Sequence, residues 1–100
     1  MELNSLLNKV DFVLTLAAKG EMSENELKCV ESFLLEHSDH PRLGRVFGYS
    51  VSDYAFASLK WVGTEETKKL FDKYFVMLST DRRNKINELI RENRHINYLS

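Results

Sequence analysis

Apolar residues recur at spacings of three and four along most of the chain, which is the pattern of helices with one buried face. In the first stretch these positions are Leu3, Leu6, Leu7, Val10, Val13, Leu14 and Ala17. Gly20 follows them and predicts the end of this helix, because glycine adopts the left-handed backbone conformation that closes many helices. No run of alternating β-branched residues occurs, so the sequence predicts no sheet.

A second helix is predicted to begin at a capping box. Ser23 can accept a hydrogen bond from the amide of Glu26, and the Glu26 side chain can reach back to the amide of Ser23. The inward positions that follow are Leu27, Val30 and Leu34, with Phe33 beside them. This helix should fade between His37 and Asp39, because Pro41 disfavours the helical conformation at the residue before it.

Three further helices are predicted, each starting at a hydroxyl side chain that can cap it. The predicted caps are Ser50 or Ser52 for a helix that runs through Val62 to Gly63, Thr64 for the next, and Thr80 for the last. Their bulky or inward residues are Tyr54, Phe56, Leu59 and Trp61, then Leu70, Phe71, Tyr74, Phe75 and Leu78, then Ile86, Leu89 and Ile90. Residues 42–50 are open to either a helical turn or a loop, and residues 94–100 to either a frayed end or a docked tail.

The helices and their short connections predict an all-α fold, a compact bundle of four or five antiparallel helices. Residues 1–100 suit a single domain, because this length is close to the commonest size of one folding unit. An apolar fraction of 43% and a charged fraction of 29% are ordinary for a globular protein.

The sequence favours a cytoplasmic location. Cys29 is the only cysteine, so no internal disulfide is available, although small secreted domains often depend on one. Asp11 interrupts the first apolar run and no cleavage-site pattern follows, so we expect no signal peptide. No stretch approaches the ~20 apolar residues that span a bilayer, so we expect no membrane partner.

The turn between the first two helices resembles a known family. The segment from Ala17 to Leu27, with Lys19-Gly20-Glu21-Met22-Ser23 at its centre, is similar to the A-D-G-E-I-S-x-x-E turn of TerB-like (tellurite-resistance) domains and to the second half of an EF-hand loop. The resemblance covers about residues 6–36 and implies a helix pair, and it offers a TerB-like accessory role in stress or phage defence as an alternative function. In these families an aspartate before the glycine takes part in binding a divalent cation, and Lys19 stands at that position here.

The sequence predicts no metal site, no cofactor and no enzymatic activity. At the turn, Thr15 and Ala17 fall at the earlier EF-hand ligand positions and do not supply the oxygen ligands that calcium needs. The cluster His37-Ser38-Asp39-His40 has the spacing of metal ligands, but it precedes a proline and has no third strong ligand near it. Cys29 is interpreted as a buried apolar residue, since no neighbouring base would activate it.

Charge divides the chain into two unlike halves. Residues 1–40 carry eight acidic residues and three lysines, a net charge of −5, whereas residues 41–100 carry seven acidic and eleven basic residues, a net charge of +4. A partner selected by charge would therefore meet one half. We expect a non-enzymatic protein-binding module, similar in size and charge to the inhibitors and immunity proteins of bacteria and phages, that docks its acidic half on a basic partner. The predicted contact residues are Glu21, Glu24, Glu31, Glu36 and Asp39, with Tyr49 and Tyr54, the aromatic residues least committed to a helical stripe.

The basic half supports a rival function. The last two predicted helices and the Ser79-Thr80 turn have the order of a DNA-reading helix-turn-helix. Its candidate contacts are Arg82, Arg83, Lys85, Arg91 and Arg94. Glu88 and Glu92 share this helix at spacings that permit ion pairs, so a solvated helix face is the simpler interpretation. The sequence leaves the oligomeric state and the identity of the partner open.

Overall fold

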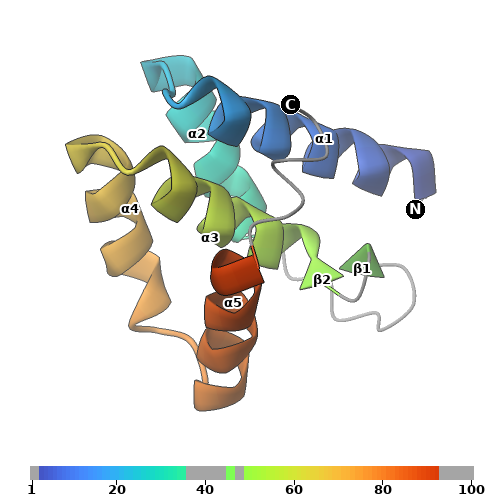
Figure 1. The fold of residues 1–100 in the computed structure, drawn as a ribbon, viewed down its shortest axis with the longest axis vertical. Helices are drawn as coiled ribbons and strands as arrows, with labels where there is room; N and C mark the ends of the chain where they lie inside the picture. The colour runs from blue at the N-terminus through green and yellow to red at the C-terminus, as the bar shows by residue number, and fades with distance from the viewer. Residues whose placement is uncertain (1–2, 36–44, 47–48, 93–100) are drawn as a thin grey trace.

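Five helices and one short hairpin make up the described part of this computed structural model, which covers residues 3–35, 45–46 and 49–92 (Figure 1). The helices are α1 (Leu3–Lys19), α2 (Glu24–Leu34), α3 (Val51–Val62), α4 (Glu65–Phe75) and α5 (Thr80–Glu92). The strands β1 (Arg45–Val46) and β2 (Tyr49–Ser50) pair antiparallel, with Arg45 opposite Ser50 and Val46 opposite Tyr49. The all-α class is confirmed. The short hairpin departs from the prediction because two residues per strand are too few to produce an alternating pattern.

Helix α3 is the centre of the molecule. Every residue from Val51 to Leu59 is buried, as expected for a helix that is enclosed on all sides. Helices α1, α2, α4 and α5 each pack against α3, and in Figure 1 α1 and α3 cross the molecule side by side. Short connections predicted that successive helices would be neighbours. This holds for α2 with α3 and for α3 with α4, and α1 and α5 also pack on α3, whose alanines, Ala55 and Ala57, are fully buried and leave room for close approach.

Aromatic side chains join α3 to α4. The Phe56 and Phe71 ring centroids lie 5.7 Å apart in an edge-to-face arrangement, and Phe75 stacks on Phe71 at 4.6 Å. Such pairs add to the burial of their apolar area. Ile86 and Leu89 of α5 are also fully buried, and the Trp61 Nε1–H donates to the carbonyl oxygen of Ile90. The predicted inward faces of α4 and α5 therefore meet the core.

The helix starts follow the predicted capping chemistry with two refinements. Ser23 and Thr64 cap α2 and α4, as predicted, and Ser23 forms the full capping box with Glu26. Of the two candidates for α3, Ser50 is the cap, and Asp53 completes a capping box with it. For α5 the Ser79 hydroxyl accepts from the amide of Arg82, so Ser79 and not Thr80 is the cap, because Thr80 is already the first helical residue.

Glycines end α1 and α3. Gly20 has φ = 82° and Gly63 has φ = 71°, both in the left-handed region. Residues other than glycine rarely adopt this backbone conformation, because their Cβ atom comes too close to the following carbonyl oxygen. Both predicted helix ends are confirmed.

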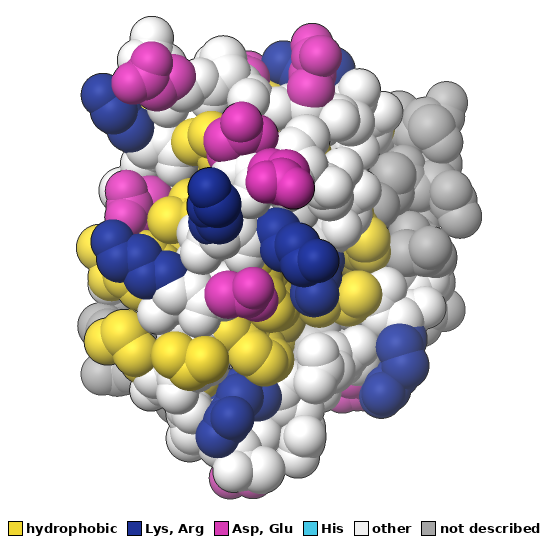
Figure 2. Space-filling model, turned by 90° about the vertical axis from the view of Figure 1, so that its left-hand side faces the viewer, with side chains coloured by type: hydrophobic (Ala, Val, Ile, Leu, Met, Phe, Trp, Pro, Cys, Tyr) yellow, Lys and Arg dark blue, Asp and Glu magenta, His cyan; other side chains and the backbone are white. Residues whose placement is uncertain are grey.

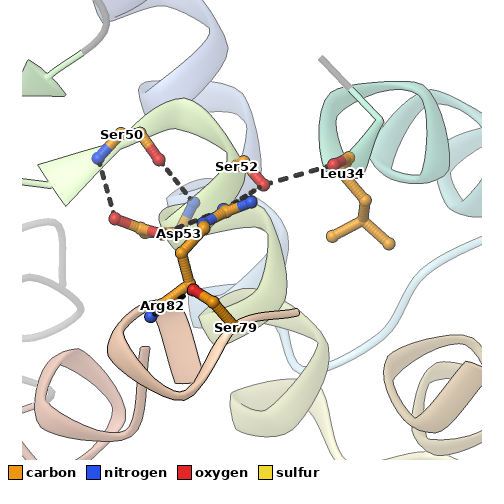
Figure 3. A network of polar contacts seen from close by, with 6 residues as sticks. All are labelled: Leu34, Ser50, Ser52, Asp53, Ser79 and Arg82. Carbon is orange, nitrogen blue, oxygen red and sulfur yellow. Dashed lines mark hydrogen bonds and ion pairs between the residues drawn. The ribbon is translucent and has the colours of Figure 1, made fainter. Parts of the chain in front are cut away.

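A network of polar contacts ties together the ends of three helices (Figure 3). Arg82 of α5 donates through Nη2 to Ser52 Oγ at 2.9 Å and to Asp53 Oδ1 at 3.3 Å. The Ser52 hydroxyl in turn donates to the carbonyl oxygen of Leu34 at the end of α2, over 3.2 Å. The Asp53 side chain is only 9% exposed, so a facing guanidinium offsets the cost of burying its charge.

Candidate functional site

A hollow of about 360 Å³ lies between α2 and α4, and we call it the α2/α4 groove. It is lined by Glu24, Leu27, Lys28 and Glu31 of α2 and by Glu66, Lys69, Leu70 and Lys73 of α4. Both sets follow the spacing i, i+3, i+4, i+7, so each helix contributes one continuous face. Figure 2 shows the side of the molecule that carries α4, where apolar surface is bordered by basic and acidic side chains.

The floor of the groove is apolar and its walls are charged. Leu27 and Leu70 are half-buried and pack against the core. The Glu24 side chain is 88% exposed and pairs with Lys28 at 4.0 Å, an exposed contact that contributes less than about 1 kcal/mol. Glu66 and Lys69 are exposed and form no ion pair with any described residue. These charges can therefore turn toward a bound partner at little energetic cost.

Tyr74, near the end of α4, bonds to one of the residues that line the groove. The Tyr74 hydroxyl donates to Glu31 Oε2 at 2.6 Å, and the Lys73 ammonium lies 5.2 Å from the centre of the Tyr74 ring. The hydrogen bond to Glu31 raises the pKa of Tyr74, because it stabilises the neutral phenol, and burial raises it further. Glu31 is thus engaged inside the fold, whereas Glu24 is the freer carboxylate.

The structure brings together only part of the predicted acidic surface. Glu24 and Glu31 share the groove, and Glu21 is exposed in the turn between α1 and α2. Glu36 and Asp39 lie outside the described residues. Helix α4 adds Lys69 and Lys73 opposite the acids of α2, so this face has mixed charge. The sequence reasoning missed the α4 residues, although their helical spacing around Leu70 could have indicated a second face.

Tyr49 and Tyr54 lie in the core, which corrects their assignment as partner contacts. Tyr54 is fully buried and Tyr49 is 6% exposed, and their rings meet edge to face at 5.9 Å. Lys85 covers the Tyr49 ring at 5.0 Å. Burial is the main cause that raises the pKa of Tyr54.

The predicted nucleic-acid residues do not gather on one exposed face. Arg82 is engaged with Asp53, Arg83 and Lys85 are half-buried, and Arg91 is exposed. Arg94 lies outside the described residues. Moreover, α4 and α5 each pack mainly on α3, whereas the two helices of a helix-turn-helix pack on each other.

The turn between α1 and α2 contains an ion pair between Lys19 and Glu26. Lys19 Nζ donates to both carboxylate oxygens of Glu26, at 3.2 and 3.1 Å. The amide of Ser23 and this ammonium lower the pKa of Glu26. Its carboxylate therefore has an internal counter-charge.

Candidate metal ligands and nucleophiles are sparse in the described part of the chain. There, no three His, Cys, Asp or Glu side chains lie close enough together to hold a metal ion, and the cluster from His37 to His40 lies outside it. Cys29 is exposed, so its interpretation as a buried residue is wrong. It faces outward because it sits one position before the inward Val30 on α2.

No helix among the described residues combines the length and apolar character needed to cross a membrane. No protein-family model, no curated protein and no solved structure matches this chain.

Proposed function

We propose that this protein is a non-enzymatic protein-binding module whose docking surface is the α2/α4 groove. The observation that carries the proposal is an apolar floor, Leu27 and Leu70, framed by charged side chains, of which Glu66 and Lys69 form no ion pair with any described residue. The most concrete version is an inhibitor or immunity-type protein that places the carboxylates of Glu24 and Glu66 against a basic surface of its partner.

The shape and chemistry of the groove favour a macromolecular partner. Pockets for small molecules are mostly enclosed and apolar, with a few fixed polar groups. Here the walls are long, exposed lysine and glutamate side chains on two helices, the arrangement in which an amphipathic segment is recognised. The lysines can cover apolar surface with their alkyl stems while their ammonium groups stay in water.

Two other functions draw less support. A DNA-reading helix-turn-helix would need Arg82 free, but this side chain holds Asp53 at the centre of the network in Figure 3. A TerB-like accessory role rests on the turn at Lys19, where the ammonium already pairs with Glu26.

Selection from a displayed library of random helical peptides would test the proposal. We expect the full chain to enrich a set of peptides, and Leu70→Ser to weaken their binding at least about tenfold by removing part of the floor. Val76→Ser is the matched control, because Val76 is also an apolar residue of this region, is 69% exposed and does not line the groove. The proposal is wrong if no peptide is enriched, or if Leu70→Ser binds as well as the control.

A further inference from the structure

The helices of the groove run in the same direction. Tyr74 near the end of α4 bonds to Glu31 in the second half of α2, and Leu27 faces the same hollow as Leu70. In Figure 1 both helices descend from the upper left of the molecule. The first residues of α2 and α4 therefore lie at one end of the groove and their later residues at the other.

This direction gives the groove an electrical polarity. Glu24 and Glu66, in the first turns of their helices, make one end acidic. Lys28, Lys69 and Lys73 line the remainder, where the acid Glu31 is bonded to Tyr74. The apolar floor, Leu27 and Leu70, lies about one turn of helix beyond Glu24 and Glu66, at the level of Lys28 and Lys69. Glu24 and Glu31 are about 10 Å apart along the axis of α2, which is two turns of helix.

We propose, on the basis of the docking function above, that the occupant is an amphipathic helix of the partner with opposite charges at its two ends. Apolar residues at spacings of three and four rest on Leu27 and Leu70. Lysine or arginine at one end meets Glu24 and Glu66, and aspartate or glutamate at the other end meets Lys69 and Lys73. The charges set the orientation of the helix in the groove, and the apolar residues supply most of the affinity.

The chain offers a matched pair of variants for the test. Glu66 and Lys69 line the groove, whereas Glu65 and Lys68, one residue earlier on the same helix, do not. The double variants E66K/K69E and E65K/K68E make the same charge changes, in the same turns of α4, without altering the net charge. A loss of helix stability would affect both, and a loss of docking only the first.

The probe is a displayed library of 14-residue helical peptides with fixed leucines at positions 4, 7, 8 and 11. The positions before the first leucine and after the last one carry lysine or glutamate, chosen at random. Selected on the full wild-type chain, the peptides should carry lysine at one end and glutamate at the other. They should bind E66K/K69E at least tenfold more weakly and E65K/K68E within twofold of wild type. Selection on E66K/K69E should enrich the opposite order of charges.

The outcomes separate this inference from the function on which it rests. Peptides that bind the groove with no charge preference would overturn the inference and leave the docking function standing. Equal loss of binding in both double variants would likewise overturn the inference and leave the docking function standing. If no peptide is enriched on the wild-type chain, the inference and the docking function are both overturned.

Discussion

Single side chains at both ends of α2 show how the fold uses charge locally. At the start, Glu26 accepts from the Ser23 amide and from Lys19. Near the end, Glu31 accepts from Tyr74. The bonds to Glu26 lower the pKa of that carboxyl, and the bond to Glu31 raises the pKa of Tyr74.

The pH dependence of stability should report the Glu26 bonds. Because the pKa of Glu26 in the folded chain lies below its usual 4.5, its contribution is present above that value and is lost as pH falls through the folded pKa. We expect the melting temperature of wild type to fall more steeply between about pH 5 and pH 3 than that of Glu26→Gln, which has no charge to lose. Thermal melts followed by circular dichroism measure this, with Glu24→Gln as the control from the same turn. Equal slopes for wild type and Glu26→Gln would contradict the assignment.

Alkaline titration should find one tyrosine linked to a carboxylate at the groove. The hydrogen bond to Glu31 raises the pKa of Tyr74 above its usual 10, so the stabilisation is complete below that pH and is lost as pH rises through the folded value. Glu31→Gln should move this titration toward 10, because the neutral amide is a weaker acceptor. Absorbance at 295 nm follows the phenolates of the four tyrosines, and Tyr74→Phe identifies the affected one. An unchanged curve in Glu31→Gln would show that the bond is absent in solution.

At the scale of whole elements, the sequence predicted what depends on nearby residues. The capping box at Ser23 and the glycine ends at Gly20 and Gly63 involve partners within four positions, so their spacing is visible in the chain. The choice between Ser50 and Ser52 was open, because both precede the third helix. Ser52 is not the cap because it is already the second helical residue, and its hydroxyl instead donates to the carbonyl of Leu34, a contact across 18 positions that no local pattern reveals.

The network around Arg82 should contribute to stability more than an exposed arginine does. Arg82→Met removes the counter-charge of the buried Asp53 carboxylate, which should cost about 1–3 kcal/mol of unfolding free energy. Arg91→Met, on the exposed side of the same helix, should change it by less than about 0.5 kcal/mol. Urea denaturation measures both, and equal effects would show that the network in Figure 3 does not support the fold.

At the scale of the whole molecule, the fold class was predictable, but only Glu24 and Glu31 of the candidate site were. Apolar spacing shows that a helix has a buried face, but it does not show which helices share that face. Glu66 and Leu70 are about 40 positions from Glu24 and Leu27, and only the packing of α2 and α4 around α3 makes them neighbours. The net charges of the two halves misled for the same reason, because α4 brings Lys69 and Lys73 beside the acids of α2. Aromatic content likewise did not distinguish a core position such as Tyr54 from an interface.

The docking function predicts which charges control the rate of binding. A peptide selected on the wild-type chain should associate more slowly with Glu24→Lys, and raising the salt from 50 to 500 mM should slow the wild-type encounter, because exposed charges act mainly on association. Glu24 is preferable to Glu31 for this test, since reversing Glu31 also breaks its bond to Tyr74. Stopped-flow fluorescence gives both rate constants, and dissociation should change less than association.

Glu24→Lys and a second variant, Arg91→Glu, together distinguish protein docking from nucleic-acid binding. Arg91→Glu tests the basic half better than reversal of Arg82, because Arg91 is exposed and Arg82 holds Asp53. Under the docking function Arg91→Glu leaves peptide binding within twofold of wild type and Glu24→Lys weakens it. Reversal at Glu24, in the first turn of α2, also costs a few tenths of a kcal/mol in helix-dipole energy, so the unfolding free energy of each variant must be measured beside its affinity. If the chain binds a random DNA duplex, loses that binding with Arg91→Glu and is indifferent to Glu24→Lys, then the basic half is the working surface and the groove is not.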